Sequence, residues 1–173
     1  MKRKLVASIA LPLFFYFPVQ QTPAIKAAVA KIQPDSMTIP NSWKQEMLDE
    51  VNKIRKAGCR CGRQYLPPAP PVSWNNKLEK ATQLHAKDMD EHNFMGHRGS
   101  NGSDIGDRAA KAKYNWQLVA ENVSWNYDTP SDAVLGWKTS PGHCRNMMGA
   151  GYKEMGAAKQ GLFWAQMFGR QVD

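Results

Sequence analysis

The sequence predicts an α+β domain, on three observations. Amphipathic helical segments come first, short extended segments lie between them, and a β-hairpin closes the chain. The hairpin is predicted from EMGAAKQ (154–160) and LFWAQMFGR (162–170), which alternate loosely around Gly161. No glycine-rich loop stands between a strand and a helix, which argues against a doubly wound nucleotide-binding fold.

Apolar residues at helical spacing predict a first helix over about 43–57, which Gly58 ends. A short helix is expected over about 107–114. A further main helix begins at Thr129-Pro130, because threonine is a good cap and proline suits the first turn. Pro141-Gly142 is expected to stop it.

The segment NKLEKATQLHAKDMDEHN, capped by Asn75, predicts the second main helix. One stripe of this helix carries Leu78, Thr82, His85 and Met89. His85 is therefore predicted to be a core histidine on a buried face.

Two segments are expected to be extended. The connector CRCGRQYLPPAPPVSW (59–74) contains four prolines, which exclude a helix and favour an extended path across the surface. QLVAENVSW (117–125) mixes β-branched and polar residues, which indicates a short strand or an extended segment.

The first 30 residues have the layout of a secretory signal peptide. N-terminal cations precede an apolar run over 5–19, and small-residue cleavage sites follow at Ala24 and Ala30. The run is broken by prolines and is shorter than the roughly 20 residues that a membrane span needs. We therefore expect a cleaved signal peptide over 1–30, no permanent membrane anchor, and a secreted or periplasmic protein.

Residues 31–40 are polar and contain two prolines, which predicts a disordered lead-in to a single folded domain over 41–173. The chain has a net charge of +8, and residues 1–30 hold four of its 23 cations and none of its 15 acids. The remainder is therefore only mildly basic, and its cations are scattered. This pattern argues against nucleic-acid binding, and a monomer is expected.

Three cysteines in a chain predicted to be exported suggest one disulfide and one spare thiol. Cys59 and Cys61 are separated by one residue, an awkward spacing for a bond with each other. Either can pair with Cys144, and in the chain-entropy picture such a closure stabilises the fold by roughly 4 kcal/mol. Three free thiols are the alternative. A zinc site is disfavoured, because the usual two-residue spacer is absent.

Three side chains outside the predicted helix interiors suit metal binding or proton transfer, namely His97, Glu121 and His143. Two imidazoles and a carboxylate can hold a divalent metal, Zn²⁺ or Mg²⁺, or can shuttle protons near neutral pH. They come from separate segments, so spacing does not place them together. No G-x-S-x-G turn surrounds a serine, and the adjacent His143 and Cys144 rarely face each other, so nucleophilic catalysis is not supported.

Six segments resemble one family in their content and order: LDEVNKIRKAG, VSWNNKLEKATQLHAKDM, NFMGHRGSNG, VAENVSW, VLGWKTSPGHCRNMM and YKEMGAA…FWAQMFGR. The family is the CAP superfamily of cysteine-rich secretory proteins, antigen 5 and pathogenesis-related proteins. The resemblance covers about residues 43–170 and is closest to the bacterial branch of secreted SCP-domain proteins. It implies a three-layer α-β-α sandwich with a cleft in one face.

Family members commonly gather two histidines and two acids in that cleft. By motif, His97 in MGHRG matches the first histidine and Glu121 in AEN matches the first acid. The chain departs from the full set, because the second acid falls at about Ser140 and the strand histidine of eukaryotic members falls at Phe163. The bacterial branch offers His143 of SPGH instead. The resemblance therefore implies a cleft lined by His97, Glu121 and His143, with Ser140 and Asn122 as weaker candidates.

Asn122 is expected to tie its loop down by backbone hydrogen bonds. Trp125, Trp137 and Trp164 are expected to pack in the core rather than to line an apolar ligand groove.

The resemblance implies a secreted, non-enzymatic binding module for a lipid, glycan or peptide ligand, or for a cell-envelope component. The alternative is a metal-assisted hydrolase that acts on extracellular peptide or cell-envelope polymer. A third hypothesis makes the histidine and glutamate cluster purely structural, a buried network that fastens two loops to the core.

Overall fold

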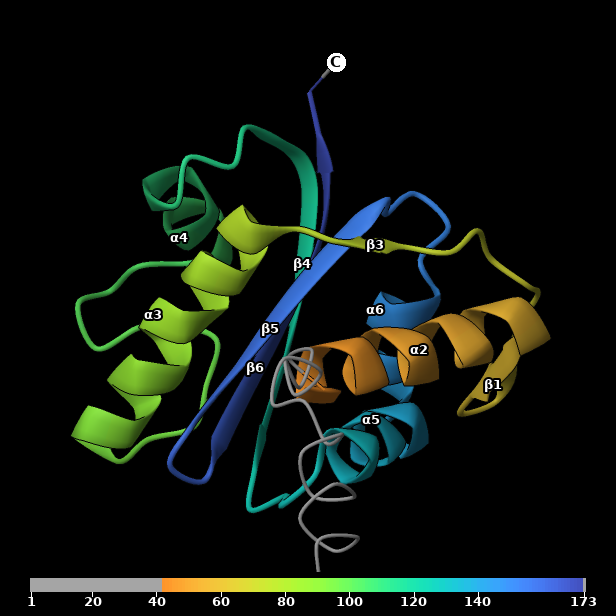
Figure 1. Cartoon of the computed structure of the whole chain (residues 1–173), viewed down its shortest axis with the longest axis horizontal. Helices are drawn as coiled ribbons and strands as arrows, with labels where there is room; N and C mark the ends of the chain where they lie inside the picture. Colours follow the sequence, from red (N-terminus) through yellow and green to blue (C-terminus); the bar gives the residue numbers. More distant parts are fainter. Residues whose placement is uncertain (1–41, 173) are drawn as a thin grey trace, which may run out of the picture. The chain divides into compact units, whose positions relative to one another are not determined.

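The structure is a computed structural model that describes residues 42–172. The predicted signal peptide (1–30) and lead-in (31–40) lie outside the described residues. A four-stranded sheet in the order β3-β5-β6-β4 lies between two groups of helices (Figure 1). Its strands are β3 (Ser73–Trp74), β4 (Trp116–Trp125), β5 (Glu154–Gln160) and β6 (Phe163–Gln171).

The last two strands, β5 and β6, form the predicted closing hairpin. Its turn passes through Gly161 at φ +52°, a left-handed conformation that glycine adopts readily. β3 pairs parallel with β5 at one edge of the sheet, and β4 pairs antiparallel with β6 at the other. β4 is thus an edge strand, with one of its two backbone edges unpaired in the sheet.

Helices cover both faces of this sheet, which confirms the α+β class with three layers. One face carries α3 (Asn76–His92) and α4 (Ile105–Lys111), and the other carries α2 (Ser42–Ala57), α5 (Pro130–Thr139) and α6 (Pro141–Met148). The alternation of side chains along a strand makes this division. Met155 and Ala157 of β5 pack with α2, α5 and α6, whereas Gly156 and Ala158 face α3.

The core confirms the predicted stripe of α3, whose members Leu78, Thr82, His85 and Met89 are all buried. Trp137 and Trp164 are buried as predicted. The prediction for Trp125 is wrong, since this residue is 51% exposed. It is the last residue of the edge strand, next to the turn at Asn126.

Three local predictions need correction. Pro141-Gly142 ends α5 but also begins α6, because proline is well accommodated in the first turn of a helix. The short helix α4 starts two residues earlier than predicted, behind a capping box of Asp104 and Asp107. The cysteine end of the connector forms a small hairpin of β1 (Cys59–Cys61) and β2 (Gln64–Leu66).

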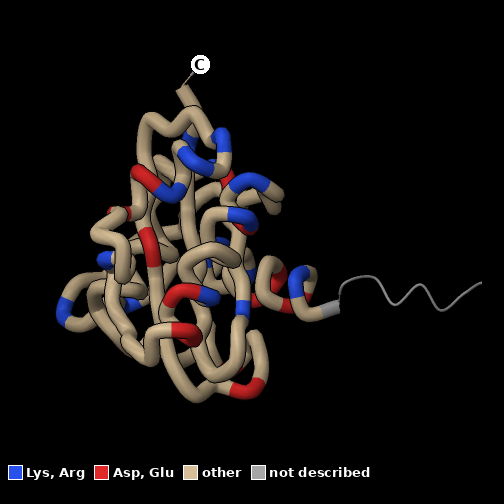
Figure 2. The backbone as a smooth tube through the Cα atoms, turned by 90° about the vertical axis from the view of Figure 1, so that its left-hand side faces the viewer, with Lys and Arg blue, Asp and Glu red and all other residues tan. Residues whose placement is uncertain are grey.

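Charged residues of both signs are interspersed along the chain (Figure 2). This distribution agrees with the scattered cations of the sequence. Within residues 42–172, no helix combines the length and the apolar character that crossing a membrane requires.

Candidate functional site

Glu121 lies near the middle of the edge strand β4 and faces the layer of α3 and α4. Val119 and Val123, two residues away on either side, pack against the clusters of that layer, so the period of the strand places Glu121 on the same face. The side chain of Glu121 is 1% exposed. A carboxylate this deeply buried needs a partner for its charge.

Arg108 supplies that partner from α4. Its Nη2 donates to Oε1 and Oε2 of Glu121 at 2.9 and 2.8 Å. The same guanidinium donates to the carbonyl oxygens of Ser103 and His97, which fixes the loop between α3 and α4 over the carboxylate. Hydrogen bonds between a guanidinium and a carboxylate are shorter and stronger than those between neutral groups.

Sequence reasoning missed Arg108, although the segment carries a signal for it. The capping box fixes the start of α4, and with that start Arg108 lies next to the buried Ala109 and one turn before the buried Ala112. An arginine on the buried face of a short helix needs hydrogen-bond acceptors inside the fold, and a buried acid is one such partner.

His97 connects the buried carboxylate to solvent. Its Nδ1 lies 3.1 Å from Oε1 of Glu121, and its side chain is 55% exposed. The hydrogen bond to Glu121 raises the pKa of His97 above the ordinary value of 6.5. Because Nδ1 is engaged with Glu121, Nε2 is the ring nitrogen that remains for a ligand.

His85 approaches the same carboxylate from α3. Its Nε2 lies 2.7 Å from the carbonyl oxygen of Gly96 and 3.7 Å from Oε1 of Glu121. Burial lowers the pKa of His85, so the ring is neutral at pH 7 and Nε2 carries the proton donated to Gly96. The prediction of a core histidine is confirmed, and its place beside Glu121 adds a polar role.

Asn122 faces the opposite layer, because it follows Glu121 in the strand. Its Nδ2 donates to the carbonyl oxygen of His143 and to Oε1 of Gln166 at 3.3 and 2.9 Å. Asn146 of α6 donates in return to Oδ1 of Asn122 and to the backbone oxygen of Glu121. As expected, Asn122 bonds to backbone, and these amides fasten α6 to β4.

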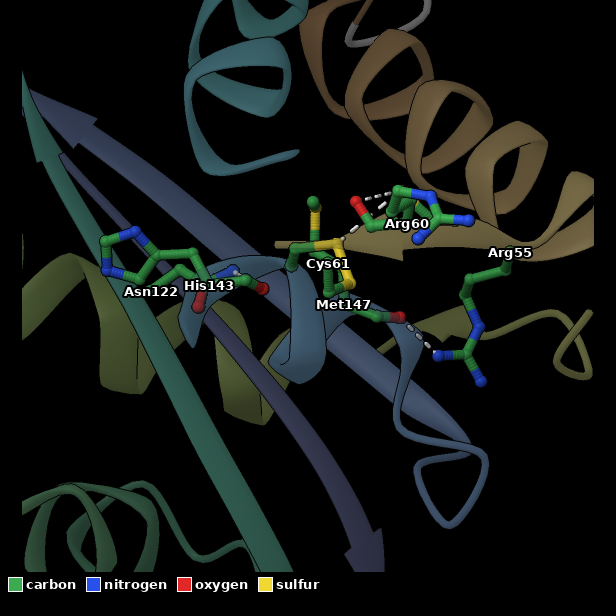
Figure 3. The surroundings of a disulfide bond; sticks show 8 residues. Arg55, Arg60, Cys61, Asn122, His143 and Met147 are labelled. Atoms are coloured by element: carbon green, nitrogen blue, oxygen red, sulfur yellow. Dashed lines mark hydrogen bonds between the residues drawn. A yellow bond between two sulfur atoms is a disulfide. The ribbon is translucent and has the colours of Figure 1, made fainter. Parts of the chain in front are cut away.

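His143 therefore reaches β4 from the other face of the sheet. Figure 3 shows its ring beside Asn122. Burial and the charge of His97 lower the pKa of His143, so the two imidazoles interact across the edge strand. Ser140 is half-buried between α5 and α6, and its side chain makes no capping hydrogen bond to α6.

A cavity of about 430 Å³ opens beside His97, between α4 and β4. Ile105, Trp116 and Val119 give it an apolar wall, and Arg98 joins His97 at its polar end. The indole of Trp116 is 41% exposed and donates to the carbonyl oxygen of Gly106, which fixes the ring in place. The cavity thus combines an apolar surface with two basic side chains and one carboxylate, that of Asp104.

The predicted trio fits a metal poorly. Within residues 42–172, one group of three potential ligand residues has all its ligand atoms within 4.8 Å of one another, and it consists of Cys59, Cys61 and Cys144. His97, Glu121 and His143 do not form such a group. Glu121 is paired with Arg108, and a guanidinium in contact with the carboxylate repels a second cation. His97 and His143 are the members left to ligate an ion, with Glu121 orienting His97 through Nδ1.

The cysteines resolve the pairing that the sequence left open. Cys61 and Cys144 form a disulfide, and Cys59 is a buried free thiol. All three sulfurs lie within 4.8 Å of one another. Soft metals bind thiolates, and a disulfide sulfur is not a thiolate, so the oxidised cluster does not offer a metal its three ligands.

The fold is that of SCP-domain proteins. An extracellular protein containing an SCP domain from Bacillus anthracis superposes with a TM-score of 0.66 at 28% identity, over 81% of this chain and 44% of that chain. NaASP2, solved with Zn²⁺, superposes with a TM-score of 0.53 at 12% identity, over 77% of this chain and 84% of that chain. The second likeness shows the fold alone.

The family model described as "Cysteine-rich secretory protein family" (CAP) matches residues 48–161, and the chain belongs to this family. "Uncharacterized membrane protein YlbC" of Bacillus subtilis is 26% identical over 131 residues, which make up 75% of this chain and 35% of that protein. The chain thus spans about a third of YlbC and less than half of the B. anthracis protein.

Proposed function

We propose that this chain is an exported, non-enzymatic binding module for a lipid-like amphiphile with an anionic head group. The cavity beside His97 carries the proposal, because one wall is apolar and its polar end holds the imidazole of His97 and the guanidinium of Arg98. Ligand sites of this kind bury an apolar body and fix its orientation through a few polar groups.

The charge of the site favours an anion, because its lining holds two basic side chains, Arg98 and His97, against one acid, Asp104. The Asp104 carboxylate accepts a hydrogen bond from the backbone of Asp107 at the start of α4, and Glu121 is paired with Arg108 below the surface. The raised pKa of His97 increases the fraction of its cationic form near neutral pH. In this proposal Glu121 positions His97, and His143 and Asn122 border the same edge of β4.

The apolar wall distinguishes this ligand class from the two others that the family resemblance allows. A glycan or a polar peptide gains little from Ile105, Trp116 and Val119, whereas an alkyl chain gains roughly 25 cal/mol for each Å² removed from water. The extracellular B. anthracis relative supports export.

A hydrolase finds no comparable support. Glu121 accepts hydrogen bonds from Arg108 and His97, so its lone pairs are engaged and it is a poor general base. Calorimetric titration with Zn²⁺ and Mg²⁺ separates the two functions. We expect no saturable one-site heat, and a heat lost in both His97→Ala and His143→Ala would favour the metal-assisted alternative.

Fluorescence quenching by a brominated long-chain fatty acid tests the proposal directly, since bromine quenches indoles that it contacts. Trp116→Phe and Trp125→Phe form a matched pair, because both tryptophans are exposed on β4 and only Trp116 lines the cavity. We expect saturable quenching in the unmodified protein and in Trp125→Phe, and a loss of most of it in Trp116→Phe.

The methyl ester of the same acid tests the head group. We expect it to bind about tenfold more weakly or worse, since one charge-assisted hydrogen bond contributes about 1.5 kcal/mol or more. His97→Ala should weaken the acid and leave the ester unchanged. Absence of saturable quenching by both ligands would refute the lipid proposal.

A further inference from the structure

The three cysteines form a single cluster where α6, which contains Cys144, packs against β1, which contains Cys59 and Cys61. The sulfur of the free Cys59 lies 3.5 Å from Sγ of Cys144, which is already bonded to Cys61. All three residues are buried. The spare thiol is therefore in contact with the disulfide rather than remote from it.

The geometry of β1 accounts for this contact. Cys59 and Cys61 are two residues apart in a strand whose burial alternates, with Arg60 exposed between them, so both sulfurs point to the same side. Within residues 42–172, β1 pairs with β2 alone, in a two-stranded sheet separate from the main one. An adjustment at β1 therefore breaks no ladder hydrogen bond of the main sheet.

We propose that Cys59 is a built-in exchange thiol, so that the long loop ending at Cys144 is closed by either of two disulfides. The thiolate of Cys59 attacks Sγ of Cys144, and the Cys59–Cys144 bond forms as the Cys61–Cys144 bond breaks. The electron pair of the broken bond goes to Cys61, which takes up the proton that Cys59 released. Two thiol-and-disulfide isomers interconvert, with no net oxidation and no outside reagent.

The movement that exchange requires is small. All three sulfurs already lie within 4.8 Å of one another, so Cys59 Sγ must close from 3.5 Å to the bond length of about 2.05 Å while Sγ of Cys61 moves away from Cys144. Cys144 follows His143 in α6, so the choice of partner also sets how α6 is tethered beside β4. This inference is independent of the ligand proposed above.

Thiol mapping of the unmodified protein tests the exchange. The protein is held without added thiol near pH 8.5, where a free thiol is partly ionised, and then quenched in acid, denatured and alkylated. We expect the label on Cys59 at first and on both Cys59 and Cys61 after incubation. A label that stays on Cys59 alone at every time and pH would overturn the proposal.

Two single variants provide an independent arm. Cys61→Ser, folded in air, should contain a Cys59–Cys144 disulfide and no free thiol, as Cys59→Ser should retain Cys61–Cys144. Cys144→Ser serves as the control, with no long-range disulfide and a lower melting temperature than either. If Cys61→Ser folds with two free thiols, or does not fold at all, Cys59 cannot replace Cys61 and the proposal fails.

Discussion

A single nitrogen of Arg108, Nη2, donates to both carboxylate oxygens of Glu121, and neither side chain is more than 5% exposed. The pair joins α4 to the edge strand β4 and neutralises the one acid of the predicted cleft. With Glu121 paired to Arg108, the proposed function assigns His97 to an anionic head group rather than to a metal.

Arg108→Met tests how much this pair contributes to the free energy of unfolding. The change leaves Glu121 buried without its cation, and removing one partner of a buried pair costs about 3–5 kcal/mol. Urea unfolding should show this loss, whereas Arg145→Met, which changes an exposed arginine of α6, should stay within about 0.5 kcal/mol of the unmodified protein. The double variant Arg108→Met/Glu121→Gln should recover part of the loss. A single variant as stable as Arg145→Met would contradict the pairing.

The titration of His97 gives a second prediction. Its folded pKa is raised above 6.5, mainly by the hydrogen bond to Glu121, so its contribution to stability is fully present below pH 6.5 and is lost as pH rises through the folded pKa. An NMR titration should find the pKa of His97 above 6.5, and Glu121→Gln should lower it, since the amide carries no charge. An unchanged pKa in Glu121→Gln would show that another group holds the proton.

The sequence correctly predicted the parts of the fold that depend on the pattern of residues within a single segment. The α3 stripe and the closing hairpin each follow from the spacing of residues within one segment. Helix α6 was missed for a local reason too, since Pro141 is a stop signal for one helix and an acceptable first residue of the next.

The site was harder to predict, because its members come from elements whose packing the sequence does not state. His97 and Glu121 were found through motifs, but Arg108 meets Glu121 across the boundary between a helix and a strand. The cysteine pairing was undecidable for a geometric reason: Cys59 and Cys61 face the same way, and both reach Cys144.

His85 predicts a pH dependence of the opposite sign to that of His97. Burial lowers its folded pKa below 6.5, so the unfolded chain takes up a proton first, and stability is lost as pH falls from 6.5 through the folded pKa. His85→Gln keeps a donor for Gly96 and should reduce the stability that is lost between pH 7.5 and pH 5. Unfolding measurements at these two pH values check this. His92→Gln changes a more exposed histidine at the end of α3, whose Nδ1 lies 3.1 Å from Oδ1 of Asp88, and it should not reduce this loss of stability. The pKa of His143 is also lowered, so His143 contributes in the same direction as His85. Part of the stability loss at acid pH should therefore remain in His85→Gln.

Gly156 of β5 marks the closest approach between the sheet and α3. A Cβ at this position would lie 2.6 Å from the carbonyl carbon of Leu78 and nearer still to the backbone nitrogen of Glu79, and backbone atoms of a packed helix cannot swing aside. Gly156→Ala should therefore push α3 away from β5 and cost about 1–3 kcal/mol or more in urea unfolding. Gly142→Ala is the matched control, since no atom lies within 4 Å of its added Cβ.

The same substitution should also affect His85, because α3 carries this residue. The displaced helix should weaken the contact of His85 with Glu121, and the NMR signal of His85 should shift in Gly156→Ala but not in Gly142→Ala. Equal stability of the two variants would mean that α3 has room to move, and the close packing inferred for this layer would be wrong.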